Sequence, residues 1–200
     1  MRITTLNHYI GVDLGQRRDY TAIALVTEQR IFSGHDKFAH NPIIHHELHV
    51  SFLKRMPLRT PYTSLPPRLH RMAIQLNPIH TTIAVDASGP GVPVVDMLKR
   101  STLAANLMPA FIAAAGDGKT MKNGFYTIGR NTLLSLLRIG LEQRMLKFAG
   151  GLRLRRELTA ELTSLAVSPH RTAAHDDLAF AIALAMWAAR TSNPSLLNVD

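Results

Sequence analysis

The sequence contains no cysteine, which excludes disulfide bonds and zinc sites built on thiolates. It has no apolar run of the roughly 18 residues that a membrane-spanning helix needs, and its N-terminus lacks the hydrophobic segment of a signal peptide. It also has no internal repeat and no long linker. These absences favour a cytoplasmic protein without membrane contacts, with one domain over residues 1–200, a core covering about residues 8–190 and a flexible tail at 191–200.

Acidic residues are few: the 200 residues include 14 Asp and Glu against 23 Lys and Arg, which gives a net charge of +9. An apolar fraction of 46% is typical of a globular protein, so this charge is expected on a folded surface. A basic surface favours a polyanionic partner, and nucleic acid is the first candidate. The alternative is a basic protein without a specific charged partner.

Hydrophobic periodicity predicts an α/β protein. Residues 8–15 alternate, with Ile10 and Val12 on one face and Gly11 and Asp13 on the other. Further strands are expected within residues 20–27, 45–56, 80–88 and 106–114, helices within 60–76, 89–101, 130–145, 155–167 and 175–190, and a loop over 115–127. The order predicts a five-stranded mixed sheet with helices on both faces, in which the first three strands form an antiparallel meander and the fourth is parallel to the first.

Two aspartates occupy equivalent places in this pattern. Asp13 and Asp86 each stand near the C-terminal end of an apolar strand with a glycine soon after ("VDLG" and "VDASGPG"). Ligands of open α/β sheets gather at the carboxyl ends of the strands. A buried carboxylate is costly unless it is paired or holds a metal, and two adjacent carboxylates must share a proton or a cation. Oxygen ligands alone favour Mg²⁺ or Mn²⁺.

The helical segment "HDDLAFAIALAMWAAR", residues 175–190, opens with Asp176 and Asp177 although it is apolar nearly all round. Acidic residues at a helix N-terminus are also favoured by the helix macrodipole, and that ordinary interpretation stays open. At about 100° per residue, Asp177 lies near a face of small residues that includes Ala181 and Ala185, and Asp176 lies roughly opposite. The small face permits close approach to a sheet, so Asp177 is the better candidate for a third metal ligand.

Three segments, "IGVDLGQRRDYTAIALV", "IAVDASGPG" and "HDDLAFAIALA", resemble in this order the nuclease domain of phage terminase large subunits. The resemblance implies an RNase H-like fold related to that of RuvC resolvases. It also implies that Asp13, Asp86 and Asp177 hold two divalent ions, Mg²⁺ or Mn²⁺, with Asp176 as a further or alternative ligand. Asp19, six residues after Asp13, matches an accessory acidic position and completes the predicted catalytic set.

The activity implied by the resemblance is that of a Mg²⁺- or Mn²⁺-dependent endonuclease that hydrolyses DNA phosphodiester bonds by a two-metal mechanism. The expected partner is double-stranded DNA, bound with low sequence specificity. Terminase large subunits carry an ATPase motor before the nuclease, whereas this sequence begins at the first strand. DNA packaging is therefore not expected of this chain by itself, and a separate packaging ATPase or portal is the protein partner that the resemblance implies.

Four basic residues are predicted to contact DNA phosphates: Arg17 and Arg18 in the turn after the first strand, and Lys119 and Lys122 within 115–127. Residues 113–120, "AAAGDGKT", resemble a P-loop but lack its first glycine. The first segment also resembles the phosphate loop of actin-like sugar kinases, which need two such domains. Two further functions stay open for an RNase H-like chain: a non-catalytic module that binds nucleic acid or a protein, and a RuvC-like resolvase.

Overall fold

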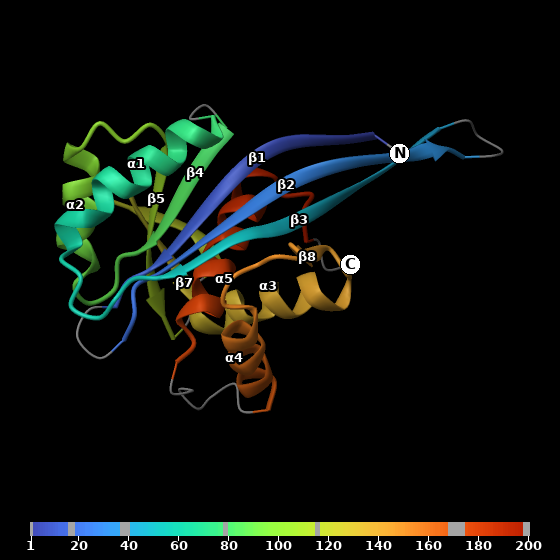
Figure 1. Ribbon diagram of the computed structural model, residues 1–200. Helices are drawn as coiled ribbons and strands as arrows, with labels where there is room; N and C mark the ends of the chain where they lie inside the picture. Colours follow the sequence, from blue (N-terminus) through green and yellow to red (C-terminus); the bar gives the residue numbers. More distant parts are fainter. Residues whose placement is uncertain are drawn as a thin grey trace.

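A mixed sheet forms the centre of the fold. The computed structural model describes residues 2–15, 19–36, 41–77, 80–114, 117–167 and 175–197. Within these ranges the strands are β1 (Arg2–Asp13), β2 (Ala22–His35), β3 (Pro42–Arg55), β4 (Thr81–Asp86), β5 (Asn106–Ala113), β6 (Asp117–Lys122), β7 (Phe125–Gly129) and β8 (Leu146–Phe148). They form one eight-stranded sheet in the order β6-β7-β5-β4-β1-β2-β3-β8 (Figure 1).

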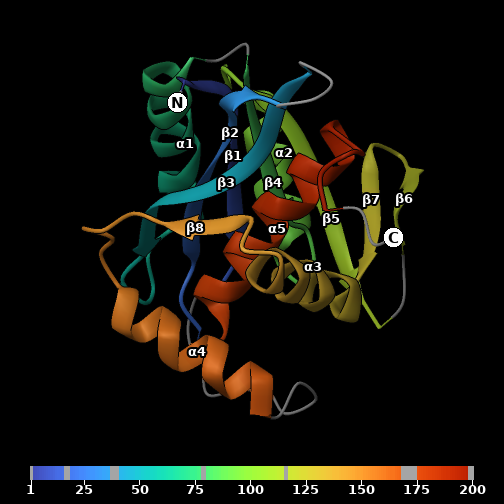
Figure 2. The ribbon, with the colours of Figure 1, turned by 90° about the vertical axis from the view of Figure 1, so that its right-hand side faces the viewer.

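Helices cover both faces of this sheet. The 3-10 turn η1 (Tyr62–Ser64), α1 (Leu65–Leu76) and α2 (Gly91–Arg100) pack on one face, and α3 (Arg130–Glu142), α4 (Arg155–Val167) and α5 (Asp177–Ser192) pack on the other (Figure 1 and Figure 2). The predicted α/β class is confirmed. The antiparallel β1-β2-β3 meander and the parallel pairing of β1 with β4 are also confirmed.

The predicted number of strands, five, is wrong, since the sheet has eight. Residues 117–129 form the β6-β7 hairpin instead of the predicted loop. Its turn residues, Asn123 and Gly124, have φ angles of 51° and 76°, and Asn-Gly is the dipeptide that adopts such a turn most readily. Because a strand and not a helix begins at Asp117, the segment 113–120 lacks the helix N-terminus that a P-loop uses to bind phosphate.

Both ends of the fold extend further than the periodicity predicts. β1 begins at Arg2 and pairs with β2 as far as Phe32, so that β1, β2 and β3 form a long arm (Figure 1). At the other end, α5 continues to Ser192, and the side chains of Leu196 and Leu197 are buried in the core beneath it. The described part of the predicted flexible tail therefore packs against the protein.

Strand residues alternate between two cores. On β1, Ile10 and Val12 face the core beneath α1 and α2, whereas Tyr9 faces the core beneath α5. On β4, Ile83 and Val85 likewise face α1 and α2. Each strand of this central pair is therefore buried on both faces, which is why its sequence is nearly continuously apolar.

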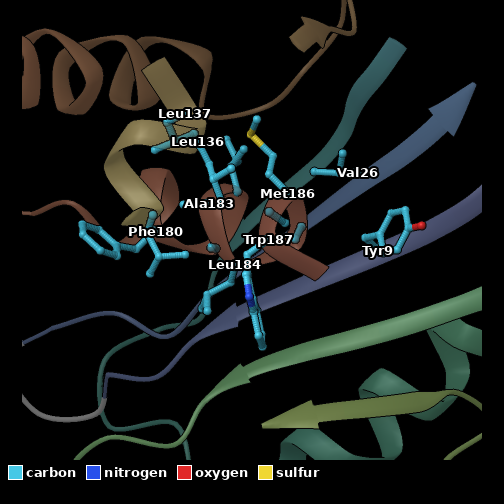
Figure 3. Close-up of a cluster of buried hydrophobic side chains, with 14 of the residues drawn as sticks. Tyr9, Val26, Leu136, Leu137, Phe180, Ala183, Leu184, Met186 and Trp187 are labelled. Carbon is cyan, nitrogen blue, oxygen red and sulfur yellow. The ribbon is translucent and has the colours of Figure 1, made fainter. Parts of the chain in front are cut away.

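Helix α5 is buried along almost its whole length. Figure 3 shows Phe180, Met186 and Trp187 of this helix together with Leu137 of α3 and Val26 of β2, all members of one buried cluster. Neither α5 nor any other helix in the described ranges is long and apolar enough to cross a membrane. Its apolar surface is instead covered by the sheet and by α3.

The backbone of α5 approaches the backbone of β1 at Gly11. A Cβ atom on Gly11 would collide with the carbonyl oxygen of Ala181 and would lie 2.8 Å from the amide nitrogen of Ala185. The small-residue face predicted for this helix therefore packs against the strand that ends at Asp13. Glycine is required at this position because there is no space for a side chain.

A buried polar cluster holds the C-terminal end of α5. The Glu28 carboxylate is fully buried and accepts hydrogen bonds from Asn7 Nδ2 at 2.8 Å, Tyr9 OH at 3.1 Å and Asn193 Nδ2 at 3.0 Å. His46 Nδ1 lies 3.2 Å from Oε1, the oxygen that also accepts from Asn193. Asn193 directly follows α5, so this carboxylate links the end of the helix to β1 and β3.

Replacing Gly11 by alanine is expected to lower the free energy of unfolding by about 1–3 kcal/mol, because the added methyl group must push α5 away from β1. Gly150→Ala is the matched control, since a Cβ atom on Gly150 meets nothing within 4 Å. Urea unfolding measures both variants. Equal stability of the two variants would contradict the close packing at Gly11.

Candidate functional site

One row of residues crosses four strands at the edge of the sheet where β1 and β4 end. Asp13 is paired with Ala22 of β2, and Ala22 is paired with Arg55 of β3. β1 and β4 are in parallel register up to the residue before each aspartate, so Asp13 and Asp86 end their strands side by side. The row therefore consists of Asp86, Asp13, Ala22 and Arg55, in this order across the sheet.

Strand alternation directs this row toward α5. Asp13 follows Gly11 by two residues, so its side chain leaves the strand on the face against which α5 packs. Asp86 follows Ala84 by two residues, and Ala84 belongs to the core beneath α5. The aspartate pair at the N-terminus of α5 lies at the same end of the sheet, which explains how residues from distant parts of the chain meet.

Four other carboxylates raise the pKa of Asp13. The pKa of the Asp13 carboxyl is raised well above its ordinary value, first by the loss of water around it and then by the negative charges of Asp86, Asp176, Asp177 and Glu161. Carboxylates from β4, α4 and the N-terminus of α5 therefore lie near enough for their charges to act on Asp13, and Glu161 of α4 is one that was not predicted.

Asp13 and Asp86 have no cationic neighbour within the described residues. Burial raises the pKa of Asp86, although its Oδ1 accepts a hydrogen bond of 2.8 Å from the backbone N–H of Ser88, which acts in the opposite direction. Among the residues that the structure describes, no Lys, Arg or His forms an ion pair with either aspartate. A pair of this kind needs a proton or a bound cation.

Arg55 neutralises the carboxylate of Asp177, at the N-terminus of α5. Its Nε donates to Asp177 Oδ2 at 2.8 Å and its Nη2 donates to Asp177 Oδ1 at 3.1 Å, which is a bidentate ion pair. The same Nη2 also contacts Glu161. Glu161 in turn accepts a 2.8 Å hydrogen bond from the backbone N–H of Ala179, in the first turn of α5. Burial raises the pKa of Glu161 to about 7, even though Arg55 and the Ala179 amide act to lower it.

Asp176 pairs with a different arginine. Arg130 Nη2 lies 2.7 Å from Asp176 Oδ2, and the Arg130 guanidinium carbon lies 4.2 Å from the centre of the Phe180 ring. The side chain of Asp176 is 24% exposed, against 6% for Asp177. Asp176 thus lies on the Phe180 side of α5, as the helical geometry predicts, while the choice between Asp176 and Asp177 as metal ligand stays a prediction.

The carboxylate oxygens are donors that a hard cation prefers, but in the described residues they do not form a complete coordination site. Within the described ranges, no three His, Cys, Asp or Glu side chains lie close enough to hold one ion. Asp13 and Asp86 are adjacent and lack a cationic partner there, so they fit Mg²⁺ or Mn²⁺. The carboxylates of Asp176 and Asp177 are paired with Arg130 and Arg55, so a cation competes with an arginine for either of them.

The other predicted site residues lie outside this cluster or outside the described ranges. Asp19 is exposed in the bend before β2, and it is not among the carboxylates that raise the pKa of Asp13. Lys122 is exposed at the end of β6. Arg17, Arg18 and the side chain of Lys119 lie outside the described residues, so their contacts with DNA stay predictions.

Glu161 and Arg55 are the residues of this network that sequence reasoning missed. Glu161 occupies a core position of α4, between the buried Leu158 and Leu165. Arg55 follows the buried Leu53 by two residues on β3, so alternation directs it inward as well. In both cases the available signal was a charged residue at a position where the pattern calls for an apolar one.

Two solved structures resemble this chain. The large terminase nuclease from the thermophilic phage G20c matches with a TM-score of 0.52 and 17% sequence identity, over 90% of this chain and 80% of that chain. The chain has the fold of a large terminase nuclease. The g2p large terminase nuclease domain from bacteriophage SPP1, solved with bound Mn, matches with a TM-score of 0.45 and 12% identity, over 78% of this chain and 67% of that one. No family model matches this sequence, and no curated protein is significantly similar to it.

Asp13→Asn is expected to stabilise this terminase-like fold in EDTA, by an amount that grows as the pH rises above about 4. A raised pKa in the folded state means that the folded protein keeps a proton that the unfolded chain releases. The wild-type protein therefore loses stability as the pH rises from the unfolded pKa through the folded one, and the variant escapes this loss. Urea unfolding of the wild type and the variant at several pH values measures this gain in stability, and Asp96→Asn, at an exposed position, is the control. A stability difference between wild type and Asp13→Asn that does not change with pH would contradict the prediction.

Proposed function

We propose that this protein is a metal-dependent endonuclease that hydrolyses DNA phosphodiester bonds. The observation that carries the proposal is the pair Asp13 and Asp86, which stand side by side at the ends of two buried parallel strands, with no cationic partner in the described ranges. Keeping two carboxylates in such a place costs stability, so a functional reason for them is required. The large terminase nuclease fold supports the same assignment.

Asp13 and Asp86 are the proposed primary ligands, Asp177 is the proposed third, and Asp176 is a further or alternative one. Carboxylate oxygens as the sole donors favour Mg²⁺ or Mn²⁺, and five neighbouring acids provide charge for two ions. The chemistry that a pair of divalent ions supplies is activation of a water for attack on phosphorus and neutralisation of charge on the departing oxygen.

In this mechanism the protein's own residues hold the two aspartate carboxylates in place for a cation. The backbone N–H of Ser88 fixes one oxygen of Asp86, which leaves the other oxygen available to a cation. The β1 and β4 strands fix the separation of the two aspartates through their hydrogen-bonded register. α5 packs against β1 just before Asp13, and this buried helix excludes water from the face of the sheet toward which Asp13 is directed. No side-chain nucleophile is needed, because water attacks the phosphorus and the P–O bond to the sugar breaks.

The proposed substrate is double-stranded DNA, bound with low sequence specificity through phosphate contacts. The net charge of +9 favours a polyanion. Lys122 is exposed at the end of β6, but its pairing with Phe125 directs it to the face of α1 and α2, whereas Asp86 is directed toward α5. Its proposed contact with DNA therefore rests on its charge and exposure. A separate packaging ATPase or portal is the proposed protein partner, as the terminase nuclease fold suggests.

A second candidate is a non-catalytic module that binds nucleic acid or a protein. The observation that favours it is the neutralisation of Asp176 and Asp177 by Arg130 and Arg55, together with the lack of a three-carboxylate group in the described residues. DNA binding without metal-dependent cleavage is the result that would identify this second function.

Purified protein is expected to nick or linearise plasmid DNA with Mg²⁺ or Mn²⁺ and to stop in EDTA. Asp13→Asn and Asp86→Asn should each reduce the cleavage rate by more than about 100-fold, because each removes a charged ligand at nearly constant volume. Asp96→Asn on the exposed face of α2 is the control. Undiminished cleavage in EDTA would exclude the metal mechanism.

Asp177→Asn is expected to slow cleavage about tenfold more than Asp176→Asn. Both substitutions remove one charge at the N-terminus of α5, so their macrodipole effects are similar, each within about 1 kcal/mol, while Asp177 is the more buried of the two. Single-turnover rates at saturating Mn²⁺ measure the difference, and thermal melts confirm folding. If Asp176→Asn does not cleave DNA while Asp177→Asn cleaves at the wild-type rate, the assignment of the third ligand is reversed.

A further inference from the structure

We infer that Arg55 is a built-in counter-ion of the acidic site, which holds Asp177 in the metal-free protein and which a divalent cation must displace. This inference rests on the proposed function, because it concerns how that site accepts its metal. Arg55 is a positioning residue in this scheme: it acts through Asp177 and does not itself touch the reacting atoms.

Arg55 occupies both oxygens of Asp177. The Nε–Oδ2 distance is 2.8 Å and the Nη2–Oδ1 distance is 3.1 Å, and the side chains of the two residues are 18% and 6% exposed. A fork-to-fork pair of this kind is among the strongest side-chain interactions, and water does not screen it here. Each carboxylate oxygen has a second lone pair for a cation, but both oxygens of Asp177 here face Arg55, whose positive charge opposes a cation at the same carboxylate. Arg55 therefore competes with a cation for Asp177.

The arrangement of the carboxylates agrees with such competition. Asp13 and Asp86 are adjacent, yet the described residues contain no group of three carboxylates able to hold one ion. Asp177 is near enough for its charge to raise the pKa of Asp13, and both of its oxygens accept from Arg55.

Arg55 has two other contacts that do not depend on Asp177. Its Nη2 contacts Glu161, and its guanidinium carbon lies 5.1 Å from the centre of the Tyr20 ring. Glu161 is itself fixed by the Ala179 backbone N–H. When Asp177 exchanges Arg55 for a cation, the guanidinium thus keeps a buried carboxylate and an aromatic face as partners, so the exchange does not leave a buried charge unpaired.

Arg130 provides a natural comparison within the same cluster. It also pairs with an aspartate of the α5 N-terminus and also lies over an aromatic ring, that of Phe180. It makes one contact with Asp176 instead of two, and both side chains are more exposed, at 32% and 24%. Removing Arg130 changes the total charge by the same amount as removing Arg55 but leaves Asp177 held.

The test measures Mn²⁺ binding by the electron paramagnetic resonance signal of free Mn²⁺, without DNA and therefore without turnover. Arg55→Gln is expected to bind Mn²⁺ about tenfold more tightly than the wild type, because no ion pair must break and one nearby positive charge is gone. Arg130→Gln is expected to tighten binding clearly less. On an Asp177→Asn background, the effect of Arg55→Gln should shrink to that of Arg130→Gln, since only the removed positive charge then acts and no ion pair with Asp177 remains to be broken.

Thermal melts give an independent readout. Without metal, Arg55→Gln should melt below the wild type, because Asp177 and Glu161 lose their partner, and Mn²⁺ should raise its melting temperature more than it raises that of the wild type. If this variant does not fold, Arg55→Lys replaces it in the binding test: lysine keeps the charge but not the fork, so binding should tighten by about threefold.

The outcomes separate this inference from the function on which it rests. Weaker or unchanged Mn²⁺ binding by Arg55→Gln, beside a wild type that binds Mn²⁺ and cuts DNA, would overturn the role of Arg55 and leave the nuclease proposal standing. Equal tightening by Arg55→Gln and Arg130→Gln would also overturn it, since only total charge would then matter. A wild type that binds no Mn²⁺ beside an Arg55→Gln variant that does would overturn the nuclease proposal and support the counter-ion.

Discussion

The contact between the backbones of α5 and β1 at Gly11 determines where the acidic residues of the site lie. Because a missing side chain lets the helix rest directly on the strand, α5 has little freedom to slide or rotate. Its first turn therefore lies at the end of β1, where Asp13 stands. Buried carboxylates then hold both ends of the helix. Glu161 accepts a hydrogen bond from a backbone N–H of the first turn, and Glu28 accepts one from the side chain of Asn193, directly after the last turn.

The electrostatic character of the site follows from this packing. Four acids from β4, α4 and the start of α5 act on Asp13, and Arg55 and Arg130 pair only with the acids of the helices. Asp13 and Asp86 on the sheet stay without a cationic partner in the described residues, at a cost in stability. Proteins retain such costs where activity depends on them, so this imbalance favours the sheet side as the place of the proposed cation.

The sequence was most informative where one pattern determined both the structure and the chemistry. The positions of Asp13 and Asp86 follow from strand alternation, and the side of α5 that carries Asp177 follows from helical geometry, so these were predictable. Glu161 and Arg55 were not, because their partners are 18 to 122 residues away and only the tertiary fold brings them together. The β6-β7 hairpin was missed for a local reason: β6 is polar, β7 has only five residues, and the Asn123-Gly124 dipeptide between them is the signal that identifies the turn.

The burial of α5 also bears on the order in which the chain becomes structured during synthesis. Both strand aspartates leave the ribosome well before α5, which follows every strand of the sheet along the chain. Until this helix docks, the face around Gly11 and the core beneath it remain uncovered, and the two carboxylates there are still hydrated. Helix docking, sealing of the core and assembly of the acidic cluster therefore all depend on α5, and none of them can be completed until this helix has been synthesised.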